Sequence, residues 1–411
     1  MTVAEAGAGP LAGIRVVDFT WVWSGPMVTY TLADLGAEVI KIEHAGRLDN
    51  ARLRGRPQRD GRPLEGPEEE VSLYFHQNNR GKLSFAVDVK APAGAQLVAR
   101  LIDEADVVID NLSVGVLERM GLGWDEISRR NPRVTMLAMS AAGQEGPLRS
   151  MKAYAPVMTG FSGLESLVGY DDDPVVGMMT IGFGDPNAAS HALVALLAAL
   201  VERERTGVGR FIDMSQIEAV VTVLAEPLAT VQLTDGEPDG RALAHASLAP
   251  HGHYPCRGED RWIAIAVASD EEWRGLAAAL DLAAAGFATS ADRLRRRAEL
   301  DELIAAATAA RERDELFVTL RRAGVRAAPV LTLEEAHADE HLRAREVFTP
   351  CDHPITGPDE LAAVPWRMSA TPPRVRRHAP AVGEHTHDIL TRVLRLDEDA
   401  IRALEASGVL R

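Results

Sequence analysis

The chain has 411 residues, of which 46% are hydrophobic and 25% charged, the usage of an ordinary globular protein. At roughly 150 residues per domain, this length predicts two domains or three. The longest apolar run, residues 192–201, is shorter than the about 20 residues that span a bilayer, so we expect no membrane association. A formal net charge of −16 repels phosphate polymers and predicts no nucleic-acid partner.

Cysteine usage and the first residues bear on the cellular compartment. Cys256 and Cys351 are the only cysteines, which is too few for a disulfide framework. The first residues show no basic region followed by an apolar run, so no secretory signal is visible. Together these features predict a reduced, cytoplasmic protein.

The first half of the chain alternates between strand and helix patterns. Strands are expected at residues 14–19, 37–43, 107–111, 134–140 and 211–214. A helix follows the first strand, with Ser24 as its cap and Gly36 at its end, and another is expected at residues 94–106. Strands separated by helical crossovers predict an α/β fold with a parallel sheet that is covered on both faces.

A loop-like region rich in Gly, Ser and Met is expected over residues 141–185. It leads to a strong helix pattern at residues 186–205. The apolar face of this helix is broad enough to predict a core helix and comprises Leu193, Val194, Leu196, Leu197, Leu200 and Val201.

The character of the chain changes near residue 225. Residues 245–256 read as a loop, 262–267 as a strand, 270–323 as helices broken near Gly286 and Ser290, and 324–330 as a strand. We therefore divide the chain into a large domain (1–224), a small domain (225–332) and a return segment (333–411) that completes the large one. The return segment has many turns and a helix at about 385–394.

Two weak motifs are better explained by structure than by function. Gly7, Gly9 and Gly13 precede the first strand, whereas a dinucleotide loop must follow a strand. His251, His253 and Cys256 could bind a metal, but no second ligand cluster accompanies them, so no metal site is expected.

The strongest local signal is Gly182-Phe-Gly184-Asp185-Pro186 at the start of the long helix. One interpretation is purely structural, because Asp is a good N-cap and Pro suits the first turn. The other uses the same geometry. The helix dipole would keep the Asp185 carboxylate ionised, the glycines would let a substrate approach the backbone, and the carboxylate could attack an activated acyl group.

A second, dispersed set of residues could form an anion site if the fold brings its cations together. Each residue alone is more typical of a solvated surface. The set comprises Asn79-Arg-Gly-Lys82, Asn111 with Arg119 and Met120, and Lys152-Ala-Tyr154.

Several motifs together resemble the family III CoA-transferases. They are Leu11–Asp18, Gly25-Pro26, Leu32–Glu43, Asn79–Ser84, Asp110-Asn111, Arg119-Met-Gly121, Thr206–Gly209, Gly324-Val325, Pro329-Val330, Ala379-Pro380 and Gly383–Thr386. The similarity extends over about residues 11–410, and the order and spacing of the motifs make it specific.

The resemblance implies a site and a chemistry. Asp185 matches the family's catalytic aspartate, which passes through aspartyl anhydride and aspartyl-CoA thioester intermediates. The substrates would be an acyl-CoA and a small carboxylic acid, with no permanently bound cofactor. Coenzyme A is expected near Val22, Lys82, Asn111, Arg119, Met120, Lys152 and Tyr154, with Lys82 and Arg119 on its phosphates.

The resemblance also implies an architecture. Family members have a Rossmann-like large domain built from both chain ends and a smaller inserted α+β domain. Two chains interlock, so we expect a homodimer.

Two alternatives stay open at this level. Acyl-CoA racemases of the same superfamily carry a histidine where this chain reads Lys152-Ala-Tyr154, so the second base is missing. A non-catalytic CoA-binding protein is disfavoured by the intact Gly184-Asp185 pair. Trp23 and Ala155 depart from residues found in some transferases, and the glycine-rich flap of formyl-CoA transferase is not seen near residues 245–256, which argues against formyl-CoA and oxalate as substrates. His44 stands where the transferases often have an arginine at the adenine or phosphate end of CoA.

Overall fold

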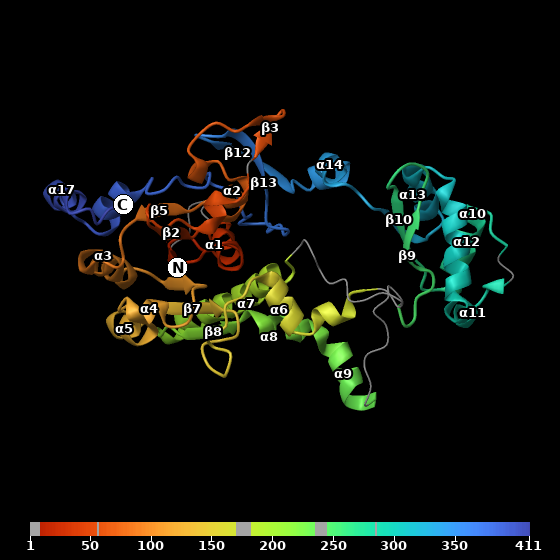
Figure 1. Cartoon of the computed structure of the whole chain (residues 1–411), viewed down its shortest axis with the longest axis horizontal. Helices are drawn as coiled ribbons and strands as arrows, with labels where there is room; N and C mark the ends of the chain where they lie inside the picture. Colours follow the sequence, from red (N-terminus) through yellow and green to blue (C-terminus); the bar gives the residue numbers. More distant parts are fainter. Residues whose placement is uncertain (1–8, 56, 170–181, 235–244, 284–285) are drawn as a thin grey trace. The chain divides into compact units, whose positions relative to one another are not determined.

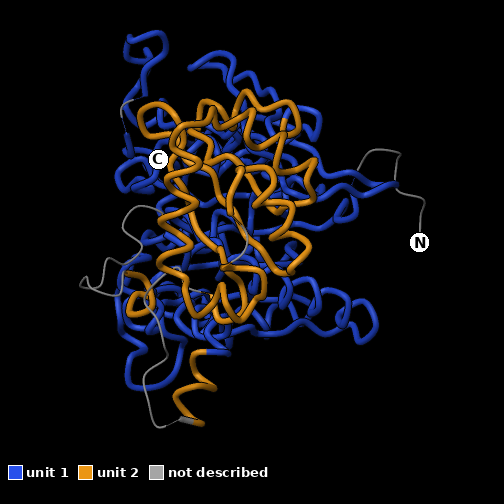
Figure 2. The backbone as a smooth tube through the Cα atoms, turned by 90° about the vertical axis from the view of Figure 1, so that its right-hand side faces the viewer, with its two compact units in different colours: residues 1–164, 178–226, 343–411 blue, residues 165–177, 227–342 orange. Residues whose placement is uncertain are grey.

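The computed structural model describes residues 9–55, 57–169, 182–234, 245–283 and 286–411 (Figure 1). The chain forms two compact units, which Figure 2 distinguishes by colour. Unit 1 comprises residues 1–164, 178–226 and 343–411, and unit 2 comprises residues 165–177 and 227–342. The two units are therefore described separately. The domain boundaries expected after residues 224 and 332 stay predictions.

Unit 1 contains a six-stranded sheet in the order β5-β2-β1-β6-β7-β8, and every neighbouring pair is parallel. This confirms the predicted α/β fold. The order is that of the doubly wound dinucleotide-binding sheet, in which the chain reverses direction between its first and fourth strands. The strands are β1 (Arg15–Asp18), β2 (Glu38–Glu43), β5 (Leu83–Ala86), β6 (Val107–Asp110), β7 (Thr135–Ser140) and β8 (Phe211–Ser215).

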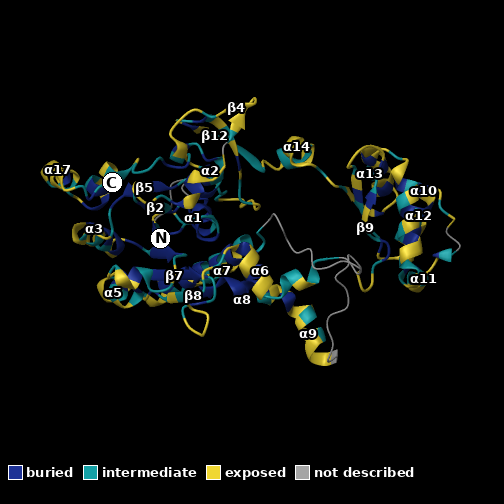
Figure 3. Ribbon diagram, viewed as in Figure 1, coloured by how far each residue is buried: buried dark blue, intermediate teal, exposed yellow. Residues whose placement is uncertain are grey.

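Helices cover both faces of this sheet. Because side chains alternate along a strand, Val17 and Val108 face one apolar core and Val16 and Val107 face the other. The first core also receives side chains from α3 (Pro92–Asp103), and the second from α1 (Ser24–Asp34) and α7 (Gly184–Thr206). Figure 3 shows the strands buried between these layers. Each fully buried apolar side chain contributes about 1.5–3 kcal/mol, so the sheet forms a stable platform for its loops.

The remaining elements of unit 1 lie around this sheet. They are η1 (Asn50–Leu53), β3 (Gln58–Arg59), β4 (Arg62–Pro63), η2 (Glu68–Glu70), α2 (Leu73–Asn79), α4 (Val116–Arg119), α5 (Trp124–Arg130), α6 (Ala155–Phe161), α8 (Gln216–Val221), η4 (Thr222–Leu224), β12 (Phe348–His353), β13 (Gly357–Ala362), α16 (Thr386–Asp388), the π-helical turn η6 (Ile389–Val393) and α17 (Glu398–Ala406).

Unit 2 is built on an antiparallel sheet in the order β11-β10-β9. Trp273 and Leu276 of its first long helix are buried against Ile263 and Ile265 of the middle strand. Its elements are β9 (His251–Pro255), β10 (Trp262–Ala266), α10 (Asp270–Leu280), α11 (Ser290–Arg295), α12 (Arg297–Ala309), α13 (Arg313–Arg322), β11 (Arg326–Pro329) and α14 (Leu333–Ala338). Three further elements cross the division between the units: η3 (Leu164–Leu167), α9 (Ala225–Thr234) and α15 (Glu340–Ala344).

Some local expectations were wrong. Residues 251–255, expected in a loop, form β9, because Tyr254 pairs with Ile263 and becomes buried there. Residues 141–185 include α6, which Pro156 helps to start. The return segment contains the hairpin of β12 and β13.

The buried face of α7 also differs from the expected one. Val194 and Val201 are 71% and 66% exposed. The buried side chains nearest them are small, Ala192 and Ala199 among them, and small residues let the helix approach its neighbours closely. Volume at the contact, rather than hydrophobicity alone, therefore selects the buried face.

Within the described ranges, no helix combines the length and the apolar character that a bilayer crossing requires.

Candidate active site

The site begins where the sheet reverses direction, between the carboxyl ends of β1 and β6. Trp21 follows β1 and Asn111 follows β6. The Asn111 amide donates to the Trp21 carbonyl at 2.8 Å and accepts from the Trp21 N–H at 2.8 Å. In doubly wound sheets this crevice is where ligands bind, and here reciprocal hydrogen bonds hold its two sides together.

Val22 has an unusual backbone in the same loop. Its φ is +68°, a strained conformation for a β-branched residue. The Val22 N–H donates to Oδ1 of Asp49 at 3.0 Å, and the preceding Trp21 is held by Asn111. The strain is thus maintained by hydrogen bonds on both sides, and it sets the direction in which the chain enters α1 at Ser24.

Asp185 lies in the first turn of α7. The N-cap of this helix is Phe183 and no side chain caps it, so the expected N-cap role of Asp185 is wrong. The backbone N–H and the hydroxyl of Ser24 instead hydrogen-bond the Asp185 carboxylate. Ser24 was expected to cap α1, but it lies inside that helix, where no side chain caps either. The two helix starts therefore meet through Ser24 and Asp185.

The pKa of Asp185 is raised above its ordinary value of 3.8, chiefly because the carboxyl group is buried. The hydrogen bonds from Ser24 and the positive charge of Arg54 act in the opposite direction. Burial therefore outweighs these favourable interactions. The result is a carboxylate that is more basic than one in water, which is a property of a better nucleophile.

A cavity of about 390 Å³ surrounds Asp185. Most of the residues expected from the sequence line it: Val22, Asn111, Lys152 and Tyr154, together with Asp185 itself. Lys152 and Tyr154 are exposed and lie just before and at the start of α6. The fold therefore brings residues from distant parts of the chain to one nucleophile.

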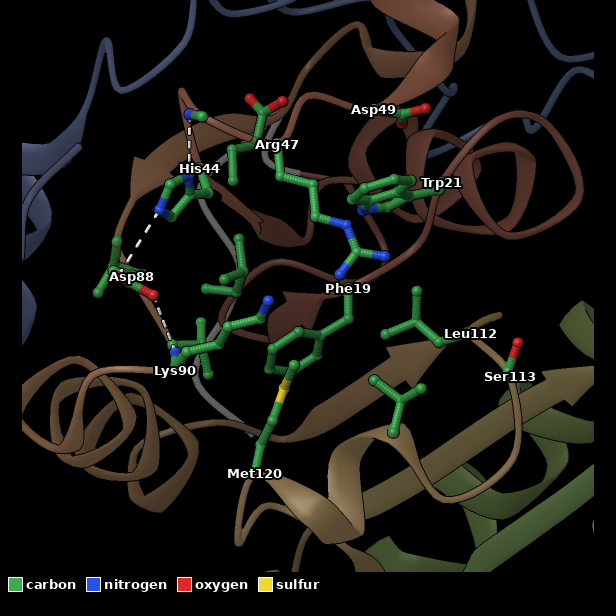
Figure 4. A pocket seen from close by; sticks show the side chains of 16 residues that line it. Phe19, Trp21, His44, Arg47, Asp49, Asp88, Lys90, Leu112, Ser113 and Met120 are labelled. Atoms are coloured by element: carbon green, nitrogen blue, oxygen red, sulfur yellow. Dashed lines mark hydrogen bonds and ion pairs between the residues drawn. The ribbon is translucent and has the colours of Figure 1, made fainter.

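A second cavity of about 530 Å³ adjoins the first and shares Trp21, Leu112 and Ser113 with it. Met120 lines this second cavity, as do His44, Arg47 and Lys90. Figure 4 shows the ends of the Arg47 and Lys90 side chains pointing into it.

Local contacts hold the walls of this second cavity. The Arg47 guanidinium lies 5.2 Å from the centre of the Trp21 ring, and Asp88 connects the Lys90 backbone N–H (3.0 Å) with His44 (3.8 Å). The cavity thus presents the positive charges of Arg47 and Lys90 and an apolar wall, and its carboxylates Glu43, Asp49 and Asp88 are bonded to Arg52, Lys41 and the Lys90 backbone N–H.

Arg119 lies elsewhere. It is exposed and lines a third cavity of about 950 Å³ with Arg129 and Arg149, and this cavity shares only Val114 with the cavity around Asp185. Arg119 and Met120 are neighbours in sequence, but their side chains line different cavities.

Lys82 lines none of these three cavities. Its ammonium is fully buried, 2.9 Å from Oδ2 of Asp18 and 2.8 Å from Oδ1 of Asn79. Burial lowers its pKa to about 8. Beside it, the Lys41 ammonium donates one hydrogen bond to the carbonyl of Thr20, the residue before Trp21, at 2.6 Å and another to Oδ2 of Asp49 at 3.0 Å. These buried lysines stabilise the loop that follows β1. Because its ammonium is buried, Lys82 has no direct access to a phosphate.

Sequence reasoning missed Ser24 as a partner of Asp185, and it missed Arg47, Lys90 and Arg54. Arg47 and Lys90 each follow a strand of the parallel sheet by a few residues, and that position was the available signal. Within the described ranges, no group of three His, Cys, Asp or Glu side chains is placed to hold a metal ion.

Comparisons with known proteins give a consistent result. The family model "CoA-transferase family III" matches residues 11–386. The chain is 34% identical over 405 residues to the succinyl-CoA–D-citramalate CoA-transferase of Chloroflexus aurantiacus, covering 98% of each chain. It is 30% identical over 406 residues to the succinyl-CoA:glutarate CoA-transferase of Mus musculus, covering 98% of this chain and 90% of the relative.

The fold is shared with solved structures. A CAIB/BAIF family protein from Brucella suis superimposes with a TM-score of 0.83 at 29% identity, over 93% of this chain and 99% of that one. A hypothetical protein from Mycobacterium tuberculosis gives a TM-score of 0.78 at 26% identity, over 93% and 99%. The matched profile and the near full-length relatives lead to one conclusion: this chain belongs to CoA-transferase family III.

Proposed function

We propose that this protein transfers CoA from an acyl-CoA donor to a carboxylic acid, with Asp185 as the nucleophile. The observation that carries the proposal is the position of Asp185, half-buried at the start of α7 and facing a cavity lined by Asn111, Lys152 and Tyr154. The racemase alternative lacks a second base there, since Lys152 and Tyr154 occupy the wall where a histidine would be needed.

The adjoining cavities suit the two ends of coenzyme A. Arg47 and Lys90 provide positive charge for the phosphates in the larger cavity, and an arginine fork matches phosphate geometry. The pantetheine arm would pass Trp21, Leu112 and Ser113, which both cavities share, and bring the sulfur to Asp185. Met120 belongs to the apolar wall of this path.

In every step of the reaction the acyl group stays activated, either as a thioester or as an anhydride. A carboxylate oxygen of Asp185 attacks the thioester carbon, the C–S bond breaks, and CoA thiolate leaves a mixed anhydride. The thiolate then attacks the Asp185 acyl carbon and releases the donor acid, which gives an aspartyl-CoA thioester. The incoming carboxylate attacks this thioester to form a second anhydride and thiolate. Attack of the thiolate on the acceptor's acyl carbon yields the new acyl-CoA and restores Asp185.

The groups around Asp185 support this sequence of steps. Lys152 places a positive charge at the cavity where oxyanions develop. Ser24 donates hydrogen bonds that stabilise the leaving Asp185 carboxylate. Burial keeps water from the anhydrides, which hydrolyse if CoA departs.

The names of the relatives point to the donor. The Chloroflexus and mouse relatives are named for succinyl-CoA with citramalate and with glutarate. We therefore propose succinyl-CoA as the donor and a dicarboxylic acid as the acceptor.

The assembly is also a proposal, that of an interlocked homodimer. It is supported by apolar side chains that the single chain leaves exposed on and beside α9, such as Leu233 (84%), Val231 (48%) and Val223 (48%). Sedimentation that shows only monomers at micromolar concentration would contradict it.

The test of function uses Asp185→Asn. The wild-type protein mixed with succinyl-CoA should carry a CoA adduct on the peptide that contains Asp185, detected by mass spectrometry, and D185N should carry none and transfer no CoA. Asp213→Asn is the matched control and should keep activity, because among the described residues this carboxylate accepts a hydrogen bond from the Gln144 N–H alone. Deuterium exchange at the α-carbon of the substrate without any adduct would favour the racemase instead.

A further inference from the structure

A small cluster of side chains extends from Asp185 and is not part of the three cavities described above. It consists of Arg54, Tyr74 and Trp23. The Arg54 guanidinium lies 4.3 Å from the centre of the Tyr74 ring, and the Tyr74 and Trp23 rings meet edge to face with 6.3 Å between centroids. These side chains come from the segment after η1, from α2 and from the residue before α1, so the fold alone brings them together.

The cluster reaches the nucleophile through Gly182. A Cβ atom added at Gly182 would lie 3.1 Å from the Trp23 ring and 3.5 Å from Oδ2 of Asp185. The tightest contact of that atom would be with Cβ of Ala155 at 2.6 Å, so this position requires a glycine, and Trp23 and Asp185 both lie next to it. An acyl group attached to Asp185 has this cluster within its surroundings.

Arg54 and Tyr74 are hydrogen-bond donors that make no hydrogen bond to a carboxylate in the described part of the chain, although the charge of Arg54 acts on Asp185. Arg54 is exposed and makes a cation–π contact but no ion pair there. The Tyr74 hydroxyl is buried beside Arg54, which can only donate, so among the described residues the hydroxyl hydrogen has no acceptor. Burial raises the pKa of Tyr74 to about 12, so the hydroxyl keeps its proton at neutral pH. A buried donor without a partner is costly unless a ligand supplies the acceptor.

The charges of the cluster and the nucleophile act on each other. Arg54 lowers the pKa of Asp185, and the charge of Asp185 raises the pKa of Tyr74. A dicarboxylic acyl group carries a second carboxylate, which the Asp185 anion repels when the substrate binds. A cation at this position offsets that repulsion, whereas a monocarboxylic acyl group has no use for it.

We infer that Arg54 and Tyr74 bind the free carboxylate of a dicarboxylic acyl group while Asp185 reacts at the other end. The inference rests on the proposed CoA transfer and specifies the substrate class within it. The planar guanidinium can hold a carboxylate through parallel hydrogen bonds, with the Tyr74 hydroxyl as a further donor. Arg54 and Tyr74 are thus specificity residues, and Trp23 packs between them and the nucleophile.

The experiment compares succinyl-CoA with butyryl-CoA, in which a methyl group replaces the free carboxylate. The measured quantity is kcat/KM for formation of the Asp185 adduct, which needs no acceptor. Arg54→Gln should lower this value about 100-fold for succinyl-CoA, the scale of a lost charged hydrogen-bond pair, and change it less than about threefold for butyryl-CoA. Arg54→Lys keeps the charge and should restore part of the loss.

Tyr74→Phe separates binding from folding. It should lower kcat/KM for succinyl-CoA about tenfold and leave butyryl-CoA unchanged. Its Tm should not fall, because the change removes a buried hydroxyl whose hydrogen has no acceptor among the described residues. Tyr254→Phe is the matched control: it loses the hydrogen bond to Asp301 in unit 2 at 2.5 Å, so it should lower Tm without altering donor selectivity.

Binding to the unreactive D185N protein gives a second readout that does not depend on turnover. D185N should bind succinyl-CoA more tightly than butyryl-CoA, and adding R54Q should abolish the difference. Equal effects of R54Q on both donors, or a D185N protein without preference, would overturn the assignment of Arg54 while CoA transfer stands. An active D185N protein would instead refute the proposed function, and the inference with it.

Discussion

The imidazole rings of His76 and His353 stack almost parallel, with 3.9 Å between their centroids and 20° between their planes. His76 lies in α2 and His353 ends β12, so the contact ties the N-terminal segment of unit 1 to its return segment. Nε2 of His76 bonds the Glu70 carbonyl at 3.0 Å, and Nδ1 of His353 accepts from the N–H groups of Ile355 and Thr356 at 3.3 Å. Because Nδ1 of His353 accepts, its ring must be neutral, and a charge on either ring would be unfavourable at this buried stack.

Stability should therefore fall in mild acid. Burial lowers the pKa of both His76 and His353 from 6.5 to about 4. Between these two pKa values the unfolded chain binds more protons than the native one. The free energy of unfolding therefore rises as the pH increases from about 4 to 6.5, and it decreases again as the pH falls through this range. The contribution is on the order of 3 kcal/mol per group. Urea unfolding at pH 7 and pH 5 should show about 2 kcal/mol of this loss per group, and the remainder appears below pH 5.

His353→Gln should flatten this pH dependence, because it removes one of the two titrating rings. His387→Gln, which changes an exposed histidine paired with Glu398, is the control and should leave the slope unchanged. Equal slopes for wild type and H353Q would assign the acid sensitivity to other groups.

The buried pair of Lys82 and Asp18 should be strongly coupled. Lys82→Met leaves Asp18 buried without its nearest counter-charge and should cost about 3–5 kcal/mol of unfolding free energy. Asp18→Asn should also destabilise, and the double variant should be more stable than the sum of the single effects predicts. A double-mutant cycle from denaturant unfolding measures this coupling. Additive effects would mean that Lys41 alone neutralises Asp18.

Ser24→Ala should move the pH dependence of catalysis. The nucleophile must be ionised, so the acidic limb of kcat/KM follows the pKa of Asp185, which burial raises above 3.8. Removing the Ser24 hydroxyl takes away a hydrogen bond that lowers this pKa, so the limb should shift to higher pH. Activity at pH 8 should fall less than activity at pH 5.

Ser269→Ala provides the comparison for Ser24→Ala, because Ser269 caps α10 in unit 2 through the Glu272 N–H at 3.1 Å. Its pH–rate profile should match that of the wild type. A profile of S24A that is unshifted would show that the hydroxyl does not act on Asp185 in solution.

Two arginines, Arg47 and Arg119, are alternative candidates for binding the phosphates of CoA. Arg47 lines the cavity that adjoins Asp185, whereas Arg119, favoured by the sequence, lines a separate one. We expect Arg47→Gln to raise the Kd of CoA about tenfold and to weaken its salt dependence, the scale of one charged hydrogen bond, and Arg119→Gln to have a smaller effect. Calorimetric titration with CoA at two salt concentrations measures both Kd values. A larger increase of Kd in the Arg119 variant than in the Arg47 variant would show that Arg119 binds the phosphates.

The α/β fold and most strands of the parallel sheet could be predicted from the sequence. Runs such as Val16-Val17 and Val107–Ile109 are apolar on consecutive positions, and only a strand buried on both faces uses such a pattern. The position of Asp185 at the start of a long helix could likewise be found, because glycine, proline and helix periodicity are local signals. β9 could not, since His251-Gly-His253 acquires strand geometry only by pairing with β10.

The sequence by itself determined which residues carry charge, which segments form most strands of the parallel sheet and the long helix α7, and where the proposed nucleophile lies along the chain. Only the tertiary structure decided which of these residues meet. The fold buries Lys82 against Asp18 and directs Arg119 and Met120 to different cavities. It also brings Arg54 and Tyr74 close enough to Asp185 for their charges to act on one another. Burial and proximity depend on contacts between segments far apart in the chain, and those contacts set the pKa values, the cavities and the partners on which the chemistry depends.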